Sequence, residues 1–482
     1  MPWQFPGIAV ALFFISGVVL FFSIVSYPDS FWTVLVSVSI FTSGVYALGF
    51  AILDDYLVTC ITAAGVLNCT KGVYKMRKKN EQKLWTILFY IFIAHLLMMG
   101  IVGVIAYGNV KAIRLVIVFM DILILTFLVT NYEFKKPDPK TLTVMIAWVS
   151  VVYFTLVIIH WLFIVGVLGF QGDLRFISKI GYLEGLGNAG AGYKTVAGVL
   201  AVPAAFMLLM DEEKKNKLLG SIVLFLVFMV AILSDSRAGV LPLIICSVLM
   251  PFSIGLRKTI KMYVGALLTI VLITSVVLNR PQWVFDMSES ILGAAIISGG
   301  SHTYQYHNNT VTSAKGDSGR YMYVEAAVTA LVENPHFALT GVGNYGYFPV
   351  SGEYFNRIAS ERGSNTNVIN MGSSFGGISE PPRPPAMGAM IAEYGLVGFG
   401  LFVIMHFAVV NVVLVRKEKT GLYKLNRGKN IYVLAPVVAT IVWGYFAGLQ
   451  DICMIFLMLM PYGILHEWSR LDERYEMHND YF

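Results

Sequence analysis

Residues 84–107 read LWTILFYIFIAHLLMMGIVGVIAY, a run of 24 residues without a charged side chain. A helix of about 20 apolar residues is long enough to cross a bilayer. Similar runs recur along the chain, whose 482 residues are 57% hydrophobic and only 13% charged, with a mean hydropathy of +0.70. This composition excludes a water-soluble globule, and the continuous apolar runs exclude a membrane β-barrel, whose strands alternate. The sequence therefore predicts an all-α polytopic membrane protein.

About twelve apolar runs are long enough to be transmembrane helices. They cover residues 8–26, 31–53, 84–107, 112–130, 142–170, 195–210, 218–233, 238–254, 262–278, 396–415, 431–448 and 452–465. The predicted organisation is a membrane domain over 1–278 with nine spans, a large loop over 279–384, a membrane domain over 385–465 with three spans, and a tail over 466–482. A loop of that length is expected to be a small functional domain. Within it, apolar residues at helical spacing predict one amphipathic helix over 320–333, ended by Asn334-Pro335.

Lysine and arginine clusters indicate the orientation, because cytoplasmic loops carry an excess of positive charge. The clusters lie at 71–83, 135–140, 214–217, 257–261 and 416–429, each after an even-numbered span. Both termini are then expected in the cytoplasm and the large loop outside. The net charge of +6 resides mainly in these loops, so no nucleic-acid partner is predicted.

Four arginines map to the predicted outer face: Arg175, Arg237, Arg320 and Arg383. Arg237 lies in the polar segment SDSRAG (234–239) between two apolar runs, and Arg320 is at the head of the amphipathic helix. Guanidinium groups bind phosphate bidentately, and a helix N-terminus adds backbone donors. The four predict an outward-facing anion pocket. The alternatives are that Arg237 pairs with Asp235 at a turn and that the others are solvated or structural.

Other polar positions have two interpretations each. Asn188, in the glycine-rich segment GYLEGLGNAGAGYK (181–194), either lines the pocket or satisfies backbone groups in a re-entrant turn. Asp121, in the middle of an apolar run, is either a proton or cation relay or is paired with a neighbouring helix. His95 is expected to be a satisfied core histidine. No metal site is expected, because no metal-ligand motif accompanies the histidines or the four cysteines.

Three segments, in this order, resemble the O-antigen polymerase and O-antigen ligase superfamily of bacterial envelope glycan assembly. They are SDSRAGVLPL (234–243), SGRYMYVEAAVTALVENPHFALTGVGNYGYF (318–348) and MIAEYGLVGFGLF (390–402). The resemblance covers roughly residues 170–415. It implies a glycosyltransferase of the bacterial inner membrane that needs no nucleotide sugar, metal or other cofactor, with its large loop in the periplasm. Its donor would be a glycan linked to a polyprenyl diphosphate, presented from the outer leaflet of the bilayer.

The resemblance also implies roles for individual residues. Arg175, Arg237 and Arg320 would hold the diphosphate and stabilise the charge that grows on the leaving group. Gly341 and Gly343 fit the family's Gly-x-Gly turn after the amphipathic helix. A base in the loop would assist the acceptor hydroxyl.

One departure favours a polymerase over a ligase. Ligases of the superfamily usually carry His-Asn shortly before a Glu-x-Gly motif, whereas this chain has Arg383-Pro384-Pro385 ahead of Glu393-Tyr394-Gly395. His336 is then the substitute candidate for the base. The expected function is polymerisation of lipid-linked oligosaccharide repeat units, with a chain-length regulator protein as a candidate partner. The alternatives are a ligase that transfers glycan to lipid A core, and a transporter or flippase of a lipid-linked glycan.

Overall fold

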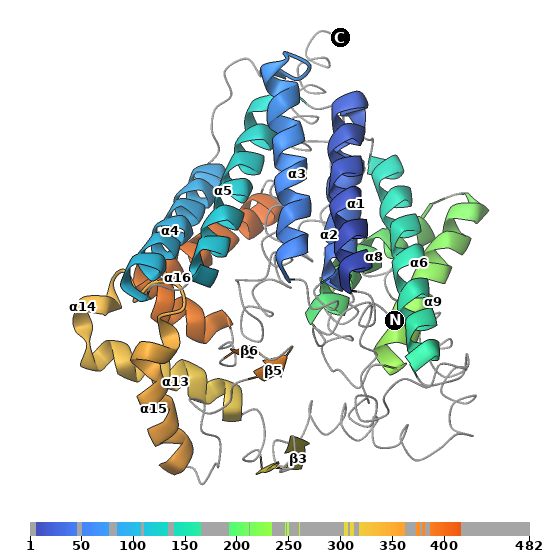
Figure 1. The fold of residues 1–482 in the computed structure, drawn as a ribbon. Coiled ribbons are helices and arrows are strands. Elements are labelled where there is room, and N and C mark those ends of the chain that lie inside the picture. The colour runs from blue at the N-terminus through green and yellow to red at the C-terminus, as the bar shows by residue number, and fades with distance from the viewer. Residues whose placement is uncertain are drawn as a thin grey trace.

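A computed structural model describes most of the chain from residue 6 to residue 415. The described ranges are 6–45, 51–76, 84–107, 110–133, 139–164, 192–211, 213–233, 303–306, 309–312, 318–361, 373–375, 378–380 and 386–415, with the isolated positions 246, 248, 249 and 260. These residues are mainly helical (Figure 1). The predicted spans at 238–254, 262–278, 431–448 and 452–465 fall almost wholly outside them.

The first two described ranges hold three α-helices where the sequence predicts two. Helix α1 (Pro6–Ser26) leads through the short helix η2 (Pro28–Ser30) into α2 (Phe31–Val45), and α3 (Ala51–Thr70) follows. The chain bends by 120° between α1 and the stretch Pro28–Leu35. Helices α1 and α3 lie side by side and run in the same direction, since Tyr56 donates to the carbonyl of Phe14 and Asn68 to that of Ile24. The sequence conceals α3 because its polar side chains lower the local hydropathy.

Helices α4 (Leu84–Tyr107) and α5 (Val110–Asn131) form an antiparallel pair, as predicted from their apolar runs. Helix α5 runs parallel to α3, with Thr59 against Asp121 and Gly65 against Leu128. Strand β1 (Lys75–Met76) after α3 then pairs with β2 (Tyr132–Glu133) after α5. The segments that lead into the lysine-rich clusters at 71–83 and 135–140 therefore share one end of the bundle.

Helix α1 begins far from the first lysine-rich cluster. Because α1 and α3 are parallel, Pro6 lies at the end of this pair opposite Lys71. The cytoplasmic location of both termini stays a prediction.

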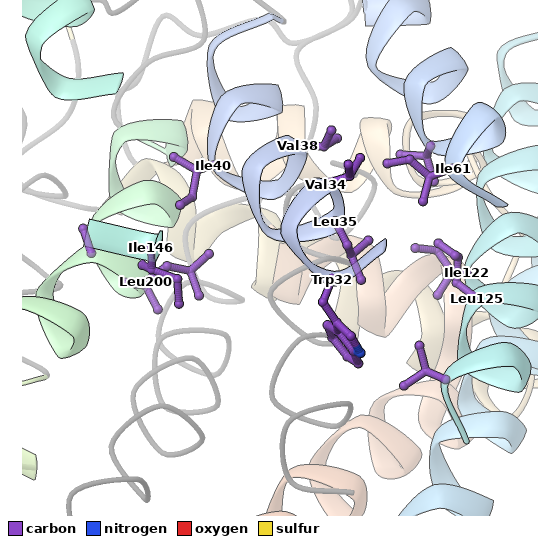
Figure 2. Packing of buried hydrophobic residues seen from close by; sticks show 14 of the residues in the cluster. Trp32, Val34, Leu35, Val38, Ile40, Ile61, Ile122, Leu125, Ile146 and Leu200 are labelled. Atoms are coloured by element: carbon purple, nitrogen blue, oxygen red, sulfur yellow. The ribbon is translucent and has the colours of Figure 1, made fainter. Parts of the chain in front are cut away.

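Helix α2 packs between two groups of helices. Figure 2 shows Leu35 and Val38 of α2 near Ile61 of α3 and near α5 on one side, with Ile40 toward the other side. On that other side lie α6 (Pro139–Ile164) and α8 (Gly192–Leu209), and α9 (Lys214–Leu233) packs on both. Each helix of the core thus buries an apolar face against its neighbours.

The remaining described helices lie near the end of α4 that is opposite β1 and β2. They are α13 (Ser318–Glu333), α14 (Pro335–Ala338), α15 (Tyr347–Glu361) and α16 (Ala386–Val415). Helix α13 confirms the helix predicted over 320–333, and α16 begins ten residues before its predicted start at 396. Two short antiparallel hairpins complete the described chain: β3 (Thr303–Tyr306) with β4 (Asn309–Thr312), and β5 (Ser373–Phe375) with β6 (Ile378–Glu380).

Within the described residues, three helical stretches are long and apolar enough to cross a membrane: Thr86–Tyr107, Thr141–Ile159 and Met387–Ala408. The bent pair α1 and η2–α2 makes a fourth if it is taken as one broken span. Many large apolar side chains on these helices are exposed, as expected for surfaces that face lipid.

Candidate functional site

The candidate site is the place where three distant segments meet through their backbones. These are residues 339–346 after α14, residues 392–397 of α16 and residues 99–103 of α4, which we call the glycine junction. Val342 N donates to Ala392 O (2.9 Å) and Gly343 N to Glu393 O (3.0 Å). In the opposite sense, Val397 N donates to Leu339 O (3.1 Å).

A break in α16 makes these hydrogen bonds available. Gly395 has φ 63° and ψ −171°, outside the helical region, although helix continues on both sides. Such a break leaves the preceding carbonyls without their usual partners four residues later. The carbonyl of Tyr394, the residue before the glycine, accepts a hydrogen bond from α4. His95 Nε2 lies 2.9 Å from Tyr394 O, and a carbonyl can only accept. His95 is therefore a satisfied core histidine, as predicted.

Segment 339–346 also closes onto α4. Asn344 N donates to Met99 O (3.0 Å), and the hydroxyl of Tyr107 donates to Val342 O (2.9 Å). A side chain at Gly103 would collide with the carbonyl oxygen of Asn344. Only a glycine lets the backbone of this segment approach α4 so closely.

Gly341 and Gly343 have packing reasons to be glycines. Their φ angles are 90° and 89°, a region that other residues rarely adopt. A Cβ on Gly341 would also lie 2.6 Å from the backbone nitrogen of Gly395, and one on Gly343 would lie 2.9 Å from that of Gly103. The substrate-binding role that the resemblance implies for both glycines stays a prediction.

The interior of this junction holds buried polar side chains. Glu393 and Asn344 are buried, and both polar atoms of the Asn344 side chain lack a hydrogen-bond partner. The buried hydroxyl of Tyr394 lacks one too. Buried polar groups without partners are uncommon in folded proteins and are often kept for function.

The carboxylate of Glu393 also acts on a tyrosine of α15. The hydroxyl of Tyr347 donates to Tyr323 O at 2.8 Å. Burial raises the pKa of Tyr347 well above 10, and the charges of Tyr323 and Glu393 raise it further. The junction is thus a chemically distinctive part of the described chain.

The structure brings together only some of the predicted site residues. Gly341 and Gly343 lie in the junction next to Glu393. His336 lies on α14 with an exposed side chain, and its ring contacts Phe337 at a centroid distance of 4.0 Å. Arg320 is in the first turn of α13, but its side chain lies outside the described part of the chain. The four other predicted positions lie outside the described residues: Arg175, Asn188, Arg237 and Arg383.

The structure also places Asp121, another polar residue that the sequence analysis singled out. Thr59 donates to the carboxylate of Asp121 at 2.6 Å, so Asp121 bonds to a neighbouring helix, which was one of its two interpretations. Among the described residues, no three His, Cys, Asp or Glu side chains are grouped so that they could hold a metal ion.

Glu393, Asn344 and Tyr107 were not among the predicted site residues. For Glu393 a signal was present, since a lone carboxylate at the start of an apolar run demands a partner or a role. Asn344 and Tyr107 gave no comparable signal, because their importance comes from a contact between α4 and a segment more than 200 residues away.

The chain matches no family model, and a search of the curated proteins gives no match.

Proposed function

We propose that this protein is a glycosyltransferase that polymerises oligosaccharide repeat units linked to a polyprenyl diphosphate, at the outer face of a bacterial inner membrane. One observation carries the proposal. Two of the three segments that resemble the O-antigen polymerase and ligase superfamily, 318–348 and 390–402, meet backbone to backbone at Gly343 and Glu393. Segments that share one site are expected to be in contact, and these are separated by a stretch of polar chain.

The end of the bundle at which they meet also supports the proposal. The glycine junction contacts the half of α4 that ends at Tyr107, whereas β1 and β2 lie at the opposite end of the α3–α5 pair. If the lysine-rich end faces the cytoplasm, residues 318–361 face the periplasm. A lipid-linked donor in the outer leaflet would be accessible there.

The starts of α13 and α16 are close to one another. A side chain on Gly388 would lie 3.3 Å from the backbone of Tyr323. Arg320 precedes Tyr323 by one helical turn, and Arg383 precedes Gly388 by a few residues along the chain. In the proposal, these two arginines with Arg175 and Arg237 bind the diphosphate. They stabilise the charge that develops on it as its bond to the anomeric carbon breaks and the acceptor oxygen bonds to that carbon.

The two candidate bases differ in accessibility. His336 is exposed and can meet an acceptor hydroxyl, so it remains the base in the proposal. Glu393 is buried, so we assign it a positioning role that keeps the junction and the nearby tyrosines in place. The multi-pass membrane location and the independence from metals belong to the same proposal.

The test uses purified protein in vesicles with a fluorescent lipid-linked repeat unit. The wild-type protein is expected to produce a ladder of longer lipid-linked glycans, and Arg237→Ala or Arg320→Ala to produce none. Arg357→Ala is the matched control, because Arg357 is exposed and pairs with Glu333 on the surface. A normal ladder from Arg237→Ala would contradict the diphosphate site.

Cells distinguish the polymerase from the ligase. A deletion strain that makes lipid core with a single repeat unit has lost polymerisation. One that accumulates long lipid-linked polymer beside bare core has lost ligation.

The break in α16 favours a transporter as the second candidate, because transporters often build their sites from interrupted membrane helices. If the protein is a transporter, it catalyses neither polymerisation nor ligation. Purified protein would then move a lipid-linked glycan across vesicles without lengthening it.

A further inference from the structure

The outward surface of α13 carries two parallel stripes of opposite polarity. Each has three residues at i, i+4 spacing: Val324, Val328 and Val332 in the first, and Glu325, Thr329 and Glu333 in the second. Residues at this spacing lie on one face of a helix, one above the other. We call the first set the valine stripe.

The two inner faces of α13 show which neighbour each stripe borders. Ala326 packs with Phe355 of α15, and Ala327 packs with Ala392 of α16. On a helix, Val324 and Val328 follow Ala327 around the circumference, whereas Glu333 lies next to Ala326. Glu333 accordingly forms an ion pair with Arg357 of α15 at 3.3 Å. The valine stripe thus borders α16, and the polar stripe borders α15.

Among the described residues, none covers the outer part of the valine stripe. Val328 is 45% exposed and Val332 73% exposed. The turn after α14 adds Leu339, 63% exposed, whose carbonyl accepts the hydrogen bond from Val397 of α16. On α16, Leu396 beside it is 58% exposed. Leu396 and Val397 belong to a stretch that is apolar enough to cross a membrane, so the exposed apolar surface runs from α16 onto Leu339.

We propose that the valine stripe and Leu339 contact the acyl chains of the bilayer, so that α13 lies along the membrane surface. Figure 1 shows α13 crosswise to α1 and α3, near the ends of α4 and α16. A helix that lies in the interface places an apolar face among acyl chains and a polar face in water. The polar stripe and the Glu333–Arg357 pair provide that second face.

This contact sets the depth of the glycine junction. Helix α14 joins α13 directly to Leu339, the first residue of the junction, so a helix anchored in the interface holds the α16 break at the same level. The inference concerns lipid alone and does not depend on the proposed enzyme activity.

Photocrosslinking tests the contact in the full-length protein. p-Benzoylphenylalanine is incorporated at Val332 in one variant and at Thr329 in another, and each is reconstituted into vesicles of phosphatidylethanolamine and phosphatidylglycerol. After irradiation, lipid adducts are quantified by mass spectrometry of the peptide that carries the label. We expect several-fold more lipid adduct at Val332 than at Thr329.

Equal adduct formation at both positions, or crosslinks from Val332 to another part of the protein, would overturn the inference. Val328→Asp together with Val332→Asp gives a second measurement, since both residues are exposed and their replacement leaves the inner faces intact. In vesicles, the double variant should become resistant to protease more slowly than the wild-type protein. In detergent, the two should have the same melting temperature. An unchanged assembly rate in vesicles would also count against lipid contact.

Discussion

Helix α13 and its neighbours are held by two contacts that differ in the atoms that meet. At the glycine junction, backbone meets backbone: Gly341, Gly343 and Gly395 leave no room for a Cβ. Between α13 and α15, side chains meet, with the ring of Tyr323 4.4 Å from that of Phe355 and Met322 packed beside them. Side chains can change rotamer when a neighbour changes, whereas backbone atoms in hydrogen-bonded segments cannot move independently. The junction should therefore tolerate far less change than the α13–α15 contact.

The largest expected effect is at Gly395. A Cβ there would lie 2.6 Å from Leu339 O, on a residue with φ 63°. Gly395→Ala should lower the free energy of unfolding by at least about 3 kcal/mol, from backbone strain and steric overlap together. The measurement is the melting temperature of the detergent-solubilised protein.

Gly400→Ala on the same helix is the matched control. A Cβ at Gly400 meets nothing within 4 Å, so this substitution should be neutral or stabilise the helix by up to about 1 kcal/mol. Equal melting temperatures for the two variants would remove the distinction between the junction and the rest of α16.

The contacts of the junction, in contrast to its flanking helices, could not be predicted from the sequence. Uninterrupted apolar runs predicted α4 and α5 closely, and the spacing of apolar residues together with Asn334-Pro335 predicted α13. These signals are local. The break at Gly395 depends on donors from Val342 and Gly343, about fifty residues earlier, and no local pattern reveals such a partner.

The same limit explains why α3 was not predicted and why the buried face of α13 could not be. Helix α3 was missed because Thr59 and Asn68 make it less apolar, although both are satisfied by neighbouring helices. On α13, the apolar residues at helical spacing include both Val328, which is exposed, and Ala327, which is buried. Spacing identifies the apolar positions of a helix but does not tell whether protein or lipid covers them.

The second-largest effect is expected at the α13–α15 contact, which should lose stability at alkaline pH. Burial raises the pKa of Tyr323 from 10 to about 12. A tyrosine with a raised pKa in the folded state is neutral in both states below pH 10, so its contribution to stability is complete there. Between pH 10 and pH 12 the unfolded chain ionises first, and stability should fall by about 2 kcal/mol, given roughly 1.4 kcal/mol for each pH unit.

The melting temperature is measured from about pH 8 to about pH 12, a range that brackets the ordinary tyrosine pKa. Tyr323→Phe should reduce the slope above pH 10, the ordinary value for the group, while leaving the values below it nearly parallel to wild type. An identical alkaline slope in the variant would show that Tyr323 is not the residue that resists ionisation.

A smaller effect is expected where the two contacts adjoin. The hydroxyl of Tyr347 donates to Tyr323 O at 2.8 Å inside the protein. Tyr347→Phe should cost about 1 kcal/mol, because it removes one buried hydrogen bond and keeps the ring. Tyr354→Phe is the comparison, since the Tyr354 hydroxyl is half-buried and accepts a longer hydrogen bond, 3.4 Å, from Asn334 Nδ2. A larger loss from Tyr354→Phe than from Tyr347→Phe in denaturant titrations would contradict this order.

The smallest effect belongs to the outer rim of the α13–α15 contact. Arg357 lies 3.3 Å from Glu333 and 5.2 Å from the ring centroid of Tyr354, with about half of each charged side chain exposed. Water and salt screen such a pair, so Arg357→Ala should cost less than about 1 kcal/mol. A double-mutant cycle with Glu333→Gln isolates the ion pair from the ring contact, and its coupling energy should shrink as salt is raised. A coupling as large as the Gly395→Ala effect, and insensitive to salt, would mean that side chains at the rim hold α13 as firmly as the backbone does at the junction, and the contrast between the two contacts would be lost.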